Sequence, residues 1–245
     1  MSNPNSKPAR PPGAPAGQPD RVAVVGLSYP YRGGISHYST LLVRALRRNH
    51  QVDFITLRRQ YPGLLFPGQS QYDYSARTFE EENEAIVDSL NPWTWYQAAR
   101  RLNEADPGLI VIQWWHPFFA PAFGSMVRFL RPSVQRRVCF LCHNVLPHES
   151  NPLQSALTRY AFRKAPFFIV HSEQDKQQLM ELVPDANVRR GAHPTYEEFG
   201  VAGSNDKASA REQLGLAPDK NTILFFGLVR AYKGLRYLRS EEHTV

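Results

Sequence analysis

Short apolar runs alternate along the chain with longer segments in which apolar residues recur every three or four positions. The runs predict buried strands, and the longer segments predict amphipathic helices. The expected strands span residues 22–27, 51–57, 108–113, 136–143, 167–171 and 187–194. The expected helices span residues 33–49, 93–105, 117–131, 153–165, 172–183 and 208–218. This order predicts an α/β fold, a Rossmann-like parallel sheet with helices on both faces.

The same pattern divides the chain into four parts. Residues 1–20 are rich in Pro, Ser, Gly and Asn, which predicts a disordered tail. Residues 21–200 hold most of the alternation and predict one Rossmann-like domain, in which the irregular segment 58–91 is expected to be a functional loop or excursion. Residues 201–220 read as a linker and a helix, and residues 221–245 as a strand, a glycine turn and the start of another helix.

The net charge of the chain indicates which classes of ligand it favours. The net charge is +7, which favours phosphates, anionic lipid or nucleic acid. Two cysteines make no disulfide framework, and no apolar run approaches the ~20 residues that span a bilayer. We therefore expect a cytoplasmic protein that touches the inner face of a membrane, although the basic side chains can equally form a solvated surface. The arginines available for such contact are Arg44, Arg47, Arg48, Arg128, Arg131, Arg136 and Arg137.

Candidate binding residues follow the strands, because ligands bind outside the carboxyl ends of parallel strands. Gly33 and Gly34 open a helix, where free N–H groups suit a phosphate; the alternative is a tight turn. The dinucleotide fingerprint G-x-G-x-x-G is missing, and the second strand ends at Leu57 and Arg58 rather than at an acid. Both facts count against a nicotinamide-dependent oxidoreductase.

The sequence CFLCH, from Cys139 to His143, matches the pattern of covalent haem attachment. The residues end a strand-like run, and a zinc half-site would lack its second pair of ligands, so Cys139 and Cys142 are expected in the core. We expect neither a cofactor nor a metal. His143 lies just past the strand and is a candidate catalytic residue; the alternative is a structural histidine.

Two further clusters follow strands. Trp114, Trp115 and His116 either pack between domains or form a stacking platform for a sugar or an apolar tail. Arg230 and Lys233 lie near the start of the last expected helix, where cations are unfavourable unless an anion binds there. The alternative for this pair is a solvated basic turn.

Five segments together resemble the retaining glycosyltransferases of family 4, which have the GT-B fold. They are residues 29–46, 143–149, 169–179, 192–200 and, most specifically, LFFGLVRAYKGLRYL at 224–238. The resemblance implies two Rossmann-like domains across a cleft, a nucleotide-diphosphate sugar donor, and no metal.

The resemblance also implies residue roles. The positions of Arg230 and Lys233 grip the donor diphosphate, Gly33 and Gly34 reach toward the phosphates, and His143 lies beside the transferred sugar. The implied reaction moves a sugar, with retention, to a glycan or lipid-linked acceptor of the cell-envelope polysaccharide type, and not to nucleic acid. A noncatalytic nucleotide- or glycan-binding module is the alternative.

Two departures from the family pattern are visible. Ala192, His193 and Pro194 stand where the family often has Pro-His-Pro. The acidic pair expected well downstream has no match, so most of the second domain is absent and the chain is expected to be an inactive fragment. Residues 239–244 resemble the translation of a sequencing-library adapter, which suggests a gene model that ended early.

Overall fold

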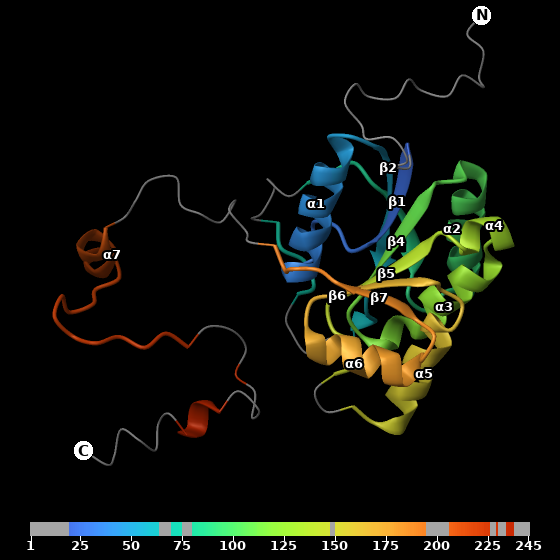
Figure 1. Cartoon of the computed structure of the whole chain (residues 1–245). Coiled ribbons are helices and arrows are strands. Elements are labelled where there is room, and N and C mark those ends of the chain that lie inside the picture. The colour runs from blue at the N-terminus through green and yellow to red at the C-terminus, as the bar shows by residue number, and fades with distance from the viewer. Residues whose placement is uncertain are drawn as a thin grey trace, which may run out of the picture. The chain divides into compact units, whose positions relative to one another are not determined.

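The computed structural model describes residues 20–63, 70–74, 80–147, 150–194, 206–225, 229 and 234–237, in two compact units, 1–193 and 194–245. In the first unit, the described residues form a seven-stranded parallel sheet of order β3-β2-β1-β4-β5-β6-β7 (Figure 1). The strands are β1 (Arg21–Gly26), β2 (Gln51–Arg59), β3 (Glu84–Asp88), β4 (Leu109–Trp114), β5 (Val138–Cys142), β6 (Phe167–Val170) and β7 (Asn187–Arg190). The predicted Rossmann-like α/β fold is confirmed.

The strand order contains one reversal. The chain moves outward from β1 to β2 and β3, then returns so that β4 pairs with the other side of β1. Val24, in the middle of β1, therefore pairs with Phe54 on one side and with Val111 on the other. The switch point between β1 and β4 is the place where sheets of this kind bind ligands, outside the carboxyl ends of the strands.

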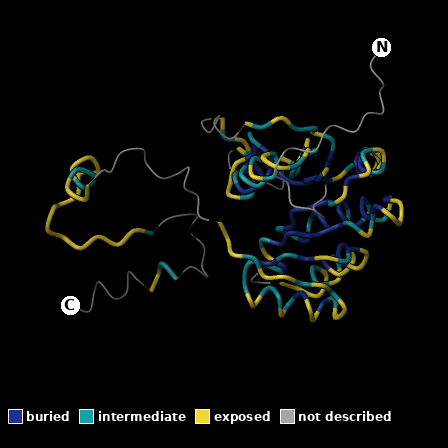
Figure 2. Tube along the Cα trace, turned by 45° about the horizontal axis from the view of Figure 1, so that its top comes forward, coloured by how far each residue is buried: buried dark blue, intermediate teal, exposed yellow. Residues whose placement is uncertain are grey.

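Helices cover both faces of the sheet. They are α1 (Gly34–Arg47), α2 (Pro92–Ala105), the short η3 (Pro117–Phe119), α3 (Ala120–Phe129), α4 (Pro132–Gln135), α5 (Pro152–Phe162) and α6 (Glu173–Leu182). One apolar core joins the sheet to α2, α3, α5 and α6, and a smaller one joins the opposite face to α1 (Figure 1). Strands β1, β4 and β5 are almost entirely buried, whereas β7 at the edge of the sheet is mostly exposed (Figure 2).

Helix α1 approaches the sheet through small polar residues. Its most buried side chains include Ser36, Ser39 and Thr40, rather than the more apolar stripe that the sequence suggested. A Cβ atom on Gly26 would lie 3.2 Å from Ser39 Oγ, so glycine in β1 permits the close approach. The Ser39 hydroxyl is satisfied by donating to the Ile35 carbonyl at 2.8 Å.

Residues that cap or favour a first turn fix the N-termini of several helices. Ser172 caps α6 as predicted, accepting from the Asp175 amide at 3.0 Å. Asn151 forms a full capping box with Gln154 at the start of α5. Pro121 was expected to interrupt a helix, but it lies in the first turn of α3, where no intrahelical donor is lost.

Strand β3 was not predicted. Its five residues lie in the segment expected to be an irregular loop, and their sequence, EAIVD, shows neither a long apolar run nor a strict alternation. An ion-pair network fixes this edge strand. Arg101 of α2 donates to Glu84 of β3 at 2.7 Å and to Asp53 of β2 at 3.2 Å, and Arg21 of β1 also donates to Asp53.

The second unit contains α7 (Lys207–Gln213), capped by Asp206. Gly215, predicted to end this helix, has a φ of 66°, and the Leu216 amide donates to the Arg211 carbonyl at 2.8 Å. Residues 221–225 were expected to form a strand. The structure shows no strand there, and these residues pair with none of the described strands. Residues 1–19, which include most of the expected tail, lie outside the described residues.

Candidate functional site

The start of α1 is built to receive a negative charge. Gly33 is the N-cap residue, with a φ of 116°, and no side chain caps the helix. Gly33 and Gly34 are exposed, and nothing lies within 4 Å of a Cβ atom placed on either. Ser36, 1% exposed, has a hydroxyl with no hydrogen-bond partner in the described part of the chain. Together with the helix dipole, these groups suit a phosphate.

Three histidines gather at the carboxyl ends of β5, β6 and β7. We call His143, His171 and His193 the histidine cluster. The ring centroids of His143 and His171 are 5.7 Å apart, and those of His171 and His193 are 5.0 Å apart. Tyr38 of α1 contacts all three rings, at 4.6 Å from His143 and 5.6 Å from each of the others. The cluster therefore joins the β5–β7 edge to the helix that begins at the glycine pair.

His143 is held as a neutral imidazole. Its Nε2–H donates to the Gln113 Oε1 at 2.8 Å, and its backbone amide donates to the Trp114 carbonyl. Burial, followed by the charges of His171 and His193, lowers the pKa of His143 from 6.5 to about 3. Because Nε2 carries the proton, Nδ1 is left as an acceptor.

His171 has the opposite tautomer. Its Nδ1–H donates to the Gly191 carbonyl at 3.2 Å, which leaves Nε2 as an acceptor. That Nε2 atom and the Nε2 of the fully buried Gln113 have no hydrogen-bond partner among the described residues. Burial lowers the pKa of His171 as well. Buried polar atoms normally have partners, so these atoms are candidate ligand contacts.

The predicted aromatic platform is only partly available. Trp114 is fully buried, and its indole N–H donates to the Val145 carbonyl at 3.2 Å, so it packs in the core and offers no face to an acceptor. Trp115 is half-buried and stacks near Phe119, with a centroid separation of 4.4 Å. His116 caps η3 through Nδ1, which accepts from the Phe118 amide.

The cysteine pattern has no role at this site. Cys139 and Cys142 are buried and reduced, and burial raises both thiol pKa values, that of Cys139 to about 11. Across the described ranges, no group of three or more His, Cys, Asp or Glu residues is arranged to hold a metal ion.

Sequence reasoning singled out His143 but missed its neighbours. Tyr38, Gln113, His171 and His193 each stand on or beside a predicted element, yet only the strand order brings them together. Gln113 could have been identified from the sequence, because alternation along β4 places it on the opposite face of the sheet from Ile112 and Trp114. Arg230 and Lys233 lie outside the described residues.

The sequence matches a known family. Residues 33–190, more than half of the chain, fit the family model described as the glycosyl transferase 4-like domain. No curated protein matches the sequence.

Solved structures with a similar fold were also found. An α-glucosyltransferase in complex with UDP and DNA is 14% identical, with a TM-score of 0.46, over 71% of this chain and 42% of that one. The apo form of a lipopolysaccharide outer-core galactosyltransferase is 11% identical, with a TM-score of 0.47, over 77% and 50%. A sucrose-phosphate synthase from Thermosynechococcus elongatus is 12% identical, with a TM-score of 0.42, over 80% and 95%. The chain thus spans half or less of the first two transferases.

Proposed function

Because the chain belongs to the glycosyl transferase 4-like domain family, we propose that it is the acceptor-side part of a retaining transferase. The proposed reaction moves a sugar from a nucleotide-diphosphate sugar to a glycan or lipid-linked acceptor, not to nucleic acid. The observation that carries the proposal lies at the carboxyl edge of the sheet, where Tyr38 of the uncapped helix α1 packs against the neutral, partly buried ring of His143.

Departure of a nucleotide diphosphate leaves charge on phosphate oxygens. Positive groups fixed around those oxygens lower the barrier most when they need no rearrangement during the reaction. In our proposal, the N–H groups at Gly33 and Gly34 supply one side of this environment, and Arg230 and Lys233 supply the other. Fixed cations of this kind do the work of a metal ion.

A neutral His143 suits a place beside the transferred sugar. Its Nδ1 accepts a hydrogen bond from a hydroxyl group without adding a positive charge that would compete for the phosphate. Trp115 and His116 remain the proposed acceptor contacts on this edge, at the end of the neighbouring strand β4.

Transfer requires donor and acceptor held in contact. The chain spans 42% of the α-glucosyltransferase to which it is similar. In our proposal, the described sheet forms one wall of a cleft, and a donor domain forms the other. We therefore expect the 245-residue chain alone to give no turnover. A longer protein that carries this chain and a donor domain should turn over the donor.

The experiment measures donor consumption by such a longer protein and by its Arg230→Ala and Lys233→Ala variants. Each variant should lose a hundredfold or more in rate, corresponding to ~3 kcal/mol of transition-state stabilisation. Arg163→Ala and Lys220→Ala, which change exposed cations elsewhere, serve as controls and should keep the rate.

Full activity in both site variants, or turnover by the 245-residue chain alone, would overturn the assignment. Donor binding without any turnover in the longer protein would instead favour a noncatalytic binding module. The anomeric configuration of the product, read by proton NMR, tests retention separately.

Membrane contact remains a separate proposal. No helix in the described ranges is long and apolar enough to cross a membrane. Of the seven arginines expected to face lipid, five bind carboxylates or carbonyls of the protein itself, and only Arg48 and Arg136 have no such contact with a described residue. We therefore expect weak binding to anionic vesicles that salt abolishes. Equal flotation with neutral and anionic vesicles would contradict it.

A further inference from the structure

Helix α2 carries aromatic rings on its outward face. Its core face buries Trp95, Ala98 and Leu102, as a surface helix requires. The opposite face is normally polar, yet here it begins with Trp93, 63% exposed, and Tyr96, 43% exposed. Two large rings left in water at neighbouring positions suggest a surface that binds something.

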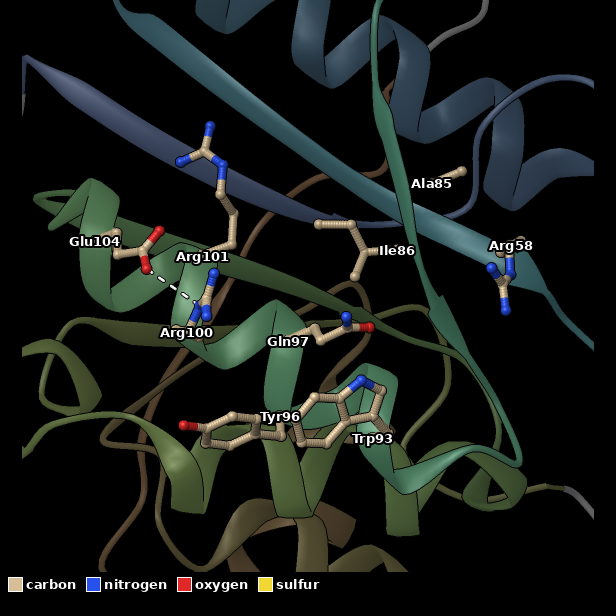
Figure 3. A pocket seen from close by; sticks show the side chains of 9 residues that line it. All are labelled: Arg58, Ala85, Ile86, Trp93, Tyr96, Gln97, Arg100, Arg101 and Glu104. Carbon is tan, nitrogen blue, oxygen red and sulfur yellow. Dashed lines mark ion pairs between the residues drawn. The ribbon is translucent and has the colours of Figure 1, made fainter.

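These rings line a cavity of about 390 Å³ between α2 and the edge strand β3. Their centroids are 5.4 Å apart, and their planes are inclined by 31°. Figure 3 shows the rings side by side along the cavity, with Gln97 and Ile86 above them, Arg58 toward one end and Arg100 toward the other. We call this cavity the α2–β3 groove.

The groove holds more positive than negative charge. It is lined by Arg58, Arg100 and Arg101 but by one carboxylate, that of Glu104. Arg58 is exposed and makes no hydrogen bond or ion pair with a described residue. Arg100 pairs with Glu104 at 3.2 Å, but both side chains are mostly exposed, so this pair is weak and exchangeable.

The third guanidinium gives the groove a fixed wall. Arg101 makes three hydrogen bonds to Glu84 and one to Asp53, which ties α2 to β3 and β2. The wall formed by Arg101 is therefore pre-formed, whereas the exposed side chains of Arg58 and Arg100 become ordered when a ligand binds.

We propose that the α2–β3 groove binds an oligosaccharide that carries carboxylate groups. The C–H faces of sugar rings pack on the faces of Trp93 and Tyr96, where the π-electrons are concentrated. The guanidinium groups of Arg58 and Arg100 bind a carboxylate through paired hydrogen bonds. The amide of Gln97, which bonds no described residue, is available to sugar hydroxyl groups.

Other occupants fit these groups less well. An acyl chain needs an apolar lining, whereas five of the nine residues that line this groove carry an amide or a charge. A purely anionic ligand, such as polyphosphate, would make no use of two adjacent exposed rings. The groove lies on the flank of the sheet and contains no residue of the histidine cluster or of the glycine pair. The inference thus goes beyond sugar transfer and can fail or hold independently of it.

The test titrates the 245-residue chain with an oligogalacturonate, and with a neutral oligomaltose of the same length, by calorimetry and tryptophan fluorescence. Trp93 is the most exposed of the four tryptophans, so its emission should report binding. We expect the acidic sugar to bind and the neutral one to bind at least about tenfold more weakly. Trp93→Ala and Arg58→Gln should each weaken binding about tenfold.

Phe167→Ala and Arg163→Gln are matched controls, because they remove an exposed ring and an exposed guanidinium elsewhere; both should bind as the parent does. Far-UV circular dichroism confirms that each variant is folded. Absence of oligogalacturonate binding to the folded chain would overturn the proposal. So would binding that survives Trp93→Ala, equal binding of polyphosphate, or a fluorescence response to anionic vesicles but not to sugar.

Discussion

Protonation of His143 should destabilise the fold as the pH falls. The folded protein keeps this imidazole neutral, with a pKa of about 3, whereas its ordinary value is 6.5. Below pH 6.5 the unfolded chain therefore binds a proton that the folded chain does not. The free energy of unfolding then falls by about 1.4 kcal/mol per pH unit until the folded pKa is reached.

The structure sets the size of the effect. Burial is the main cause of the lowered pKa, and the neighbouring charges of His171 and His193 add to it. Between pH 6.5 and about pH 5, His143 alone should cost about 2 kcal/mol. The pKa of His171 is also lowered, so the total loss should be larger.

The assay is urea unfolding of the 245-residue chain, followed by circular dichroism, at about pH 7, 6 and 5. His143→Gln replaces the imidazole with a neutral amide that can still reach Gln113, so the variant should show a shallower pH dependence by about 2 kcal/mol over this range. Leu153→Gln, which changes an exposed residue that does not titrate, is the control and should keep the parent slope. An unchanged slope in His143→Gln would refute the reasoning, whatever the absolute stability of the variant.

Three local substitutions test other parts of the structure by thermal or urea unfolding. Gly124→Ala would place a Cβ atom 2.6 Å from the ring of Tyr160, so we expect a loss of about 1–3 kcal/mol, and a loss below the error of the measurement would show that the ring moves freely. Gly33→Ala forces a side chain into a φ of 116° and should cost about 1–2 kcal/mol, whereas Gly34→Ala should cost less; equal effects would contradict the strained position. Asn151→Ala removes the capping box of α5 and should cost about 1 kcal/mol, and an unchanged midpoint would mean that packing alone fixes this helix end.

The sequence predicted the positions of the helices and strands better than it predicted which of their faces are buried. Continuous apolar runs located β1, β4, β5 and β6 to within a few residues, because strands covered on both faces leave such runs. Strands β2 and β7 were also expected, although both contain polar and exposed positions. The inward face of α1 was not predicted, since its Ser36, Ser39 and Thr40 are buried by a close approach to β1 that hydrophobicity does not encode. Strand β3 depends on pairing with β2 and on the Arg101 ion pairs, which are tertiary interactions.

Only part of the candidate site, likewise, could be predicted from the sequence. Gly33, Gly34 and His143 were found because each follows a strand at the carboxyl edge. The rest of the histidine cluster required the order β4-β5-β6-β7 and the position of α1 above it. Trp114 was misplaced because an aromatic residue at a strand end was taken as exposed, although its alternation with Ile110 and Ile112 puts it in the core.

The position of β1 at the centre of the sheet has a consequence for synthesis on the ribosome. Strand β1 is synthesised first and pairs with a neighbour on each side. Strand β2 follows it closely in the sequence, but β4 begins only at Leu109. Translation at about 5–20 residues per second leaves that second edge of β1 unpaired for several seconds. During this interval a short strand that is apolar after Arg21 presents open N–H and C=O groups, the feature from which misassembly between nascent chains starts. The half-sheet β1–β2–β3 is thus the part of this molecule whose protection by a chaperone would matter most.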